Sequence, residues 1–208
     1  MEVSYRREIC PPQGGTMETV CRNAQLIRRA AEALPHTAAP LLLALDGRCA
    51  AGKTTLAARL QAECGWEVVH LDDFFLQPQQ RTPQRLTEPG GNLDRERLIQ
   101  EVLCPLQQGQ PGSYRVFDCH TMAFRPQRLP LPSGPVVLLE GSYACHPALW
   151  DFCALHIFLT VDPEEQLRRL ARRSPEKLDA FRTRWIPMEE RYFAQYDLPR
   201  RCDLLCEG

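Results

Sequence analysis

Residues 41–55 read LLLALDGRCAAGKTT, an apolar run followed by a glycine-rich turn and the residues Lys-Thr-Thr. The apolar run has the length of a buried strand, and the residues after Lys53 show helical spacing of Leu56 and Leu60. Between these two elements, residues 47–54 match the pattern G-x-x-x-x-G-K-[ST] at every required position. A strand, this turn and a helix in that order predict a phosphate-binding P-loop, the Walker A motif.

The chemistry of phosphate binding explains the spacing of this motif. Its two glycines allow the backbone to curl so that consecutive N–H groups point at phosphate oxygens, and the following helix adds the positive end of its dipole. We expect Lys53 to reach the β- and γ-phosphates as a catalytic residue, and the Thr54 hydroxyl to bind Mg²⁺. The predicted nucleotide site comprises Gly47, Arg48, Cys49, Ala50, Ala51, Gly52, Lys53, Thr54 and Thr55.

The use of lysine supports this interpretation. Of 25 basic residues only Lys53 and Lys177 are lysine, and one of them occupies the single position where the motif requires lysine. The alternative is a chance glycine turn between a strand and a helix. Agreement of the required positions with both flanking elements makes that alternative the weaker one.

The composition bounds the class of protein. The chain has 208 residues, a net charge of -1, 44% hydrophobic and 25% charged residues, which is typical of a globular domain. The charge balance argues against a nucleic-acid binder, and no run approaches the ~18 apolar residues of a membrane span. We expect residues 1–16 to form a flexible arm and residues 17–208 one domain, located in the cytoplasm. The ten cysteines are expected to be reduced thiols, since no signal peptide or paired C-x-x-C spacing occurs.

Strands and helices alternate along the chain. Apolar runs predict further strands at 67–71, 136–139 and 155–161, and residues 114–117 are expected to form a short strand or an extended segment. Helical spacing occurs at 18–34, 95–107, 163–173 and 176–195. Proline and glycine at 82–92 predict a loop. Apolar runs without polar alternation fit strands covered on both faces, which indicates a parallel sheet in a three-layer α/β fold.

Two of the predicted strands run into carboxylates. Asp72 and Asp73 follow the strand at 67–71, and Glu140 follows the strand at 136–139. Ligands of open parallel sheets bind outside the carboxyl ends of strands, so these acids are expected beside the P-loop. A kinase that acts on a hydroxyl needs a carboxylate to orient it and accept its proton, and Asp72 is predicted for this role. Glu140 is predicted to hold Mg²⁺ with Thr54; the alternative is an acid that caps the next segment.

Aromatic and basic residues near these acids have two interpretations each. Phe74 and Phe75 either wall an acceptor pocket, the role predicted for Phe74, or belong to the core. Four arginines at 168, 169, 172 and 173 share helical faces. They form either a solvated face paired with Glu164 and Glu165 or a lid that offsets charge on a transferring phosphate. Arg169 and Arg173 are the catalytic candidates in the lid interpretation.

Taken in order, these motifs resemble the uridine kinase-like branch of P-loop kinases. The branch includes uridine-cytidine kinases, nicotinamide riboside kinases, phosphoribulokinase and bacterial-type pantothenate kinases. The resemblance covers about residues 40 to 175, and the Asp-Asp-Phe-Phe block at 72–75 is most similar to nicotinamide riboside kinases. It implies a three-layer P-loop fold with a five-stranded parallel sheet and a helical lid. It also implies ATP and Mg²⁺ as cofactors, and a small-molecule hydroxyl as acceptor.

By position, the resemblance implies that Asp72 is the catalytic base and Glu140 the acid on the metal side. Tyr114 and His120 resemble a Tyr-Asp…His stretch that holds the nucleoside in uridine kinases, although the spacing differs. The chain also departs from the family pattern. Residues 92–96 read Asn-Leu-Asp-Arg-Glu instead of Asn-Phe-Asp-His-Pro, so Asn92 and Asp94 either bind a sugar or, in the case of Asp94, cap a helix. Residues 185–193 have no counterpart; they cover the acceptor, mediate a homo-oligomer contact or pack as a terminal helix.

The sequence therefore predicts a kinase of a small metabolite, with a uridine- or cytidine-like nucleoside as the expected acceptor. One alternative is a non-nucleoside acceptor such as pantothenate or a sugar phosphate, for which Arg125 and Arg128 are available. A second is a nucleotide-binding regulatory protein without kinase turnover. We expect neither a nucleic-acid nor a membrane partner. If one thiol is reactive, Cys49 is the candidate, because a helix N-terminus lowers the pKa of a thiol.

Overall fold

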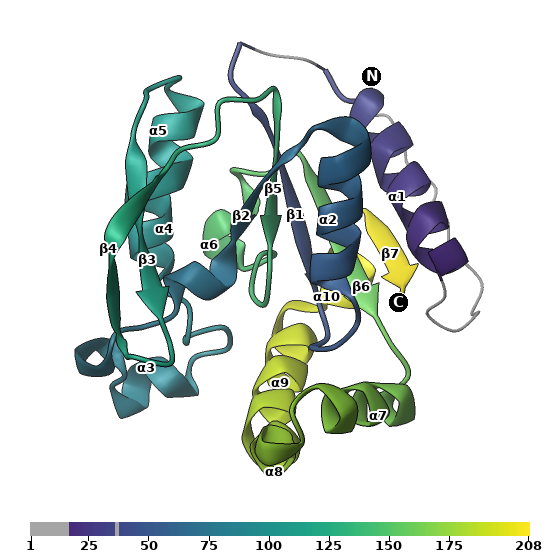
Figure 1. Ribbon diagram of the computed structural model, residues 1–208, viewed down its shortest axis with the longest axis vertical. Coiled ribbons are helices and arrows are strands. Elements are labelled where there is room, and N and C mark those ends of the chain that lie inside the picture. The colour runs from purple at the N-terminus through teal and green to yellow at the C-terminus, as the bar shows by residue number, and fades with distance from the viewer. Residues whose placement is uncertain (1–16, 36–37) are drawn as a thin grey trace.

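Five parallel strands form the central sheet of the computed structural model, which describes residues 17–35 and 38–208 (Figure 1). The expected arm at residues 1–16 lies outside the described residues. The strand order is β2–β5–β1–β6–β7, and every neighbouring pair is parallel. The strands are β1 (Leu41–Gly47), β2 (Glu67–His70), β5 (Val136–Glu140), β6 (Leu155–Thr160) and β7 (Leu204–Glu207). The predicted parallel sheet is confirmed, and the P-loop strand β1 lies at its centre.

Helices cover both faces of this sheet, as the apolar strands predict. Leu43 and Leu45 of β1 pack with helices α1 (Met17–Glu32) and α2 (Lys53–Cys64). Leu42 and Ala44 of the same strand belong to the core on the opposite face. That face is covered by α4 (Arg95–Leu98), a π-helical turn (Ile99–Leu103), α5 (Cys104–Gln107), α6 (Pro147–Trp150), α9 (Ile186–Tyr196) and α10 (Leu198–Arg201). The three-layer α/β arrangement is thereby confirmed.

A two-stranded hairpin beside the sheet differs from the prediction. Its strands are β3 (Ser113–Asp118), which agrees with the short strand expected there as one alternative, and β4 (Ala123–Pro130), which is not predicted from the sequence. The side chains of β4 are mostly exposed, so this strand lacks the apolar pattern that marks a buried one. The expected loop at 82–92 contains a short helix, α3 (Pro83–Thr87). Thr82 caps this helix by accepting a hydrogen bond from the Arg85 N–H.

The helices after β6 gather at the carboxyl ends of the strands (Figure 1). Helix α7 (Pro163–Arg173) starts at Asp162, whose side chain accepts hydrogen bonds from two backbone N–H groups of the first turn. A 3₁₀ turn (Pro175–Lys177), α8 (Leu178–Ala180), a π-helical turn (Phe181–Trp185) and α9 follow without a break. In the described part of the chain, no helix has the length and apolar character to cross a membrane.

Candidate active site

The P-loop turns sharply between β1 and α2. Ala50 (φ 60°) and Gly52 (φ 99°) are left-handed, and they curl the turn before α2 begins at Lys53. The Lys53 ammonium donates hydrogen bonds to the carbonyls of Gly47 (2.7 Å) and Arg48 (3.0 Å). Because an ammonium has three N–H groups, one remains for a ligand. The lysine is thus held in place while it faces the cleft.

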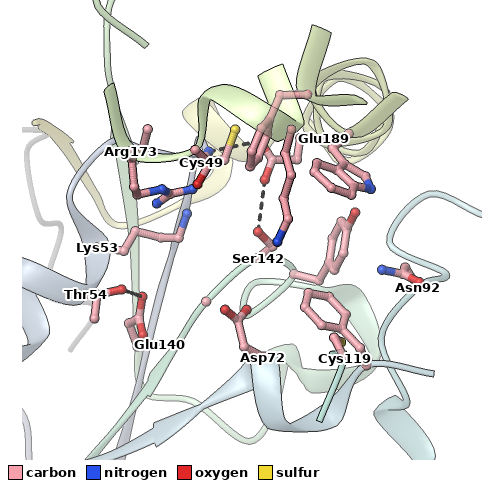
Figure 2. Close-up of a pocket in the computed structure, with 18 of the residues that line it drawn as sticks. Cys49, Lys53, Thr54, Asp72, Asn92, Cys119, Glu140, Ser142, Arg173 and Glu189 are labelled. Atoms are coloured by element: carbon pink, nitrogen blue, oxygen red, sulfur yellow. Dashed lines mark hydrogen bonds between the residues drawn. The ribbon is translucent and has the colours of Figure 1, made fainter. Parts of the chain in front are cut away.

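A cleft of about 1010 Å³ opens in front of the P-loop. It lies between the ends of β2 and β5 on one side and the helices from α7 to α9 on the other (Figure 2). Cys49, Ala50, Gly52, Lys53, Thr54 and Thr55 of the P-loop line it, together with Asp72 and Glu140. The structure therefore brings the predicted phosphate, base and metal residues to one cavity.

Glu140, the last residue of β5, contacts one residue that follows β1 and another at the end of β2. Its Oε1 accepts a hydrogen bond from the Thr54 hydroxyl at 3.1 Å, and its Oε2 lies 2.7 Å from Nδ1 of His70. The hydrogen bond to Glu140 raises the pKa of His70. Glu140 and Thr54 thus present two oxygen ligands side by side (Figure 2). The described residues hold no cluster of three or more metal-binding side chains. This arrangement fits Mg²⁺, which proteins hold through one or two carboxylates while substrate phosphates and water fill the other positions.

Asp72 belongs to a 3₁₀ turn (Leu71–Phe74) that directly follows β2. Its carboxylate points into the cleft (Figure 2). Burial raises the pKa of Asp72, and the nearby charge of Glu140 adds to this, whereas Lys53 and Arg173 act in the opposite direction. A carboxylate with a raised pKa in a cleft that P-loop residues also line is suited to accept a proton.

Comparisons with known proteins give structural neighbours. No family model matches the sequence. A protein from Bacillus stearothermophilus described as a possible uridine kinase aligns over 92% of this chain and 100% of its own, with a TM-score of 0.70 and 20% identity. A candidate fructose transport system kinase from a Silicibacter species aligns over 90% and 98%, with a TM-score of 0.63 and 24% identity. D-glycerate 3-kinase from Cryptococcus neoformans aligns over 85% and 88%, with a TM-score of 0.56 and 17% identity.

The chain has the fold of the uridine kinase-like P-loop kinases. At these identities the likeness is one of fold, and the named neighbours differ in the acceptor that their descriptions give. The P-loop kinase fold confirms the expected architecture.

Two residues predicted for the acceptor pocket of this P-loop kinase fold lie elsewhere. Phe74 is 0% exposed and Tyr114 is 4% exposed, and their rings stack on each other in the core with centroids 5.3 Å apart. The prediction that they contact the acceptor is therefore wrong. The 3₁₀ turn at 71–74 directs Phe74 into the core and leaves Phe75 to line the cleft. His120, the third predicted acceptor residue, does line the cleft.

Some arginines of α7 fit the predicted solvated face and others fit the predicted lid. Arg173 lines the cleft and lies close to Lys53 (Figure 2), and Arg172 lines it as well. Arg168 is on the exposed face, where its guanidinium pairs with Glu165. Arg169 lines the cleft, but its guanidinium is also paired with Glu165 and donates to the carbonyls of Ala50 and Gly208. Arg173 is accordingly the better placed of the two predicted catalytic arginines.

Several residues that line the cleft were not predicted as site residues. They are Arg81, Cys119, Met122, Ser142, Tyr143, Lys177, Phe181, Trp185 and Glu189. Asn92, for which sugar binding was one alternative, lines the cleft, whereas Asp94 caps α4 by accepting from the Arg97 N–H. The unmatched tract at 185–193 supplies Trp185 and Glu189 to the cleft and Tyr192 to the core. It therefore both lines the cleft and packs against the core, but it is not a terminal helix, because α10 and β7 follow it.

The lowered pKa that made Cys49 the candidate for a reactive thiol is contradicted by its surroundings. Burial, and after it the charge of Glu189, raises the pKa of the Cys49 thiol to about 12. The Gln166 amide also donates to its sulfur at 3.2 Å. The effect of the helix N-terminus does not overcome burial beside a carboxylate.

Proposed function

We propose that this protein is an ATP-dependent kinase that transfers the γ-phosphoryl group to a hydroxyl of a small metabolite, most simply a nucleoside. The observation that carries the proposal is the meeting of Lys53, the Thr54–Glu140 pair and Asp72 at one cleft. A phosphoryl transfer needs a phosphate cradle, oxygen ligands for a metal ion and a base for the acceptor hydroxyl. A protein that only binds nucleotide needs no base.

The donor side is held by the P-loop and by the two metal-side oxygens. The backbone N–H groups of the P-loop and the free N–H of Lys53 bind the phosphates. Thr54 and Glu140 would hold Mg²⁺, which when bound neutralises charge on the β- and γ-phosphates. Arg173 lies near Lys53 and adds a second positive charge at the transferring group.

Asp72 acts on the acceptor. It accepts a hydrogen bond from the acceptor hydroxyl and orients the oxygen toward the γ-phosphorus. As the new O–P bond forms and the bond to the β-phosphate oxygen breaks, the hydroxyl proton passes to the Asp72 carboxylate. ADP and the phosphorylated acceptor are the products. Burial of Asp72 favours this role because it makes the carboxylate more basic than one in water.

The cleft lining supports a nucleoside acceptor. Phe75, Tyr143 and Trp185, from three separate segments, line the same cavity as Asn92 and His120. Aromatic faces stack on a planar base, and amide and imidazole groups hydrogen-bond to sugar hydroxyls. Arg125 and Arg128, the residues considered for an anionic acceptor, lie on β4 and do not line the cleft.

Release of ADP from Mg·ATP tests the proposal. The acceptors to compare are uridine, cytidine, nicotinamide riboside, pantothenate, ribulose 5-phosphate and none. Asp72→Asn is expected to abolish acceptor-dependent release and to leave ATP binding intact. Asp73→Asn is the matched control, because Asp73 is the adjacent carboxylate and does not line the cleft.

One nucleoside that stimulates release by the unchanged protein and not by Asp72→Asn would support the acceptor class and the base together. Binding of ATP without stimulation by any acceptor would favour the regulatory alternative instead. An equal loss of ATP affinity and of rate in Asp72→Asn would contradict the role of Asp72 as base.

A further inference from the structure

Two adjacent carboxylates of α9 contact the P-loop in different ways. Glu190 pairs with the guanidinium of Arg48 through both of its oxygens. Glu189 accepts a hydrogen bond from the backbone N–H of Cys49 at 3.0 Å through Oε2, and from the Ser142 hydroxyl at 3.0 Å through Oε1. Figure 2 shows the Glu189 carboxylate between Cys49 and Ser142. One carboxylate thus binds a side chain, and the other binds a main-chain amide of the phosphate cradle.

The environment of Glu189 is unusual for a carboxylate. The residue is only 6% exposed although it lines the cleft, and no ion pair joins it to an arginine or lysine of residues 17–35 and 38–208. Hydrogen-bond donors without net charge hold it in place. Its negative charge acts on the P-loop, because it contributes to the raised pKa of Cys49. The Glu189 carboxylate therefore accepts the hydrogen bond of a P-loop N–H group, in a loop whose N–H groups otherwise bind phosphate oxygens.

The donor's terminal phosphate is expected close to this position. Lys53, which reaches the β- and γ-phosphates, is held by the carbonyls of Gly47 and Arg48, directly before Cys49. A γ-phosphate bound there approaches the Glu189 carboxylate. Like charges at short range inside a partly desolvated cleft repel each other strongly. A diphosphate ends one group earlier and avoids most of that repulsion.

We propose that Glu189 is a specificity-determining residue on the donor side, which competes with the terminal phosphate for the P-loop and lowers the preference for a triphosphate over a diphosphate. This inference rests on the proposed function, because it requires a nucleotide at the P-loop. Glu189 and Trp185 lie on one continuous helical run, and both line the cleft. The proposal predicts that removal of the charge, without removal of the helix contact, tightens triphosphate binding selectively.

Equilibrium binding separates this proposal from the proposed function. The affinities of AMP-PNP and ADP, each with Mg²⁺, are measured by calorimetry for the unchanged protein, Glu189→Gln and Glu190→Gln. Glu189→Gln is expected to bind AMP-PNP about tenfold more tightly, which corresponds to about 1.4 kcal/mol, and to change ADP affinity by less than about twofold. Glu190→Gln removes the same charge from the neighbouring position and is expected to leave the ratio of the two affinities unchanged.

Glu189→Asp provides a second variant should the amide variant fail to fold. Its shorter side chain withdraws the carboxylate from the Cys49 amide, so it too is expected to favour AMP-PNP over ADP. Unchanged or weaker AMP-PNP binding by a folded position-189 variant would overturn the inference and leave the proposed function intact. Failure of the unchanged protein to bind either nucleotide would overturn the proposed function, and the inference with it.

Discussion

The Thr54 hydroxyl donates a hydrogen bond to Glu140 Oε1 across 3.1 Å, although the two residues are 86 positions apart in the sequence. The parallel pairing of β1 with β5 explains this contact, because it sets Leu45 opposite Glu140 and ends both strands at one edge of the sheet. The first turn of α2 then places Thr54 over that edge. The pair of oxygens is therefore a product of the sheet topology.

Glu140→Gln tests the metal role of this pair. An amide oxygen is a weaker ligand for Mg²⁺ than a carboxylate, so the Mg²⁺ concentration that gives half-maximal activity is expected to rise by about 10- to 100-fold. The measurement is a titration of activity with Mg²⁺ at fixed ATP. Loss of activity that saturating Mg²⁺ fails to restore, with the same half-maximal concentration, would argue that Glu140 has another role.

The raised pKa of Asp72 predicts the acidic limb of the pH profile. A base must be deprotonated, so activity is expected to fall as the pH drops through the raised pKa of Asp72, which is above its ordinary value of 3.8. The profile of kcat/KM reports this pKa in the free enzyme. Above that pKa, Asp72→Asn is expected to lower kcat by about 10²- to 10⁴-fold, and the variant is expected to lack the acidic limb. A profile of Asp72→Asn with an unchanged acidic limb and substantial activity would assign the limb to another group.

Local sequence predicted the P-loop side of the cleft well. A motif with fixed spacing lies between a strand and a helix, and the chain itself places Lys53 and Thr54 at the start of α2. Asp72 and Glu140 were also predicted, because parallel strands bring their carboxyl ends to one edge. The fifth strand, β7, is implied only by the resemblance to a family with a five-stranded sheet. Its four residues are too few to show a recognisable hydrophobic pattern of a strand.

The acceptor side could not be predicted in the same way. Phe74 and Phe75 are adjacent and chemically alike, and only the 3₁₀ turn after β2 determines which of them faces the core. Glu189 reaches the P-loop from a helix 140 positions away, a contact that no spacing in the sequence indicates. Local patterns report the nearest neighbours of a residue, whereas these contacts depend on how distant helices pack.

The contrast between Phe74 and Phe75 can be tested directly. Phe74→Ala leaves a cavity in the core and is expected to lower the free energy of unfolding by about 3 to 5 kcal/mol, as measured by urea denaturation. Phe75→Ala removes a partly buried wall of the cleft and is expected to raise the KM for the acceptor with a smaller loss of stability. The reverse pattern would show that the 3₁₀ turn orients these rings differently.

Gly47 is predicted to tolerate no side chain. Its φ of +136° is accessible mainly to glycine, and a Cβ atom would lie 1.9 Å from the carbonyl oxygen of Leu159 on β6. Gly47→Ala is expected to lower the free energy of unfolding by about 2 to 4 kcal/mol and to weaken nucleotide binding. Gly109→Ala is the matched control, because Gly109 also has a positive φ of +64° but nothing lies within 4 Å of its added Cβ. Equal destabilisation by the two changes would mean that backbone strain, and not the clash with β6, sets the cost.

The lowered pKa of His146 predicts that the protein loses stability in mild acid. The residue is 6% exposed, and its neutral Nδ1 caps α6 by accepting a hydrogen bond from the Ala148 N–H at 3.1 Å. Burial, and next the charge of Arg95, lowers the pKa of His146 to about 4. The unfolded chain takes up this proton near the ordinary value of 6.5, so it binds more protons than the folded chain between the two values. The contribution of His146 to the free energy of unfolding is therefore fully present above pH 6.5. It decreases as the pH falls toward 4, by roughly 3 kcal/mol in total.

His146→Asn isolates this contribution. The Asn side chain carries an acceptor oxygen that can still cap α6, and it does not titrate in this range. Urea denaturation between pH 7 and pH 4 is expected to show a smaller decrease in the free energy of unfolding for this variant than for the unchanged protein. Tyr192 stacks on the imidazole, so the variant is expected to lose some stability at pH 7 as well, and the slope with pH is the informative quantity. Parallel slopes for the two proteins would show that carboxylates whose pKa is lowered in the folded state, such as Glu101, account for the acid sensitivity.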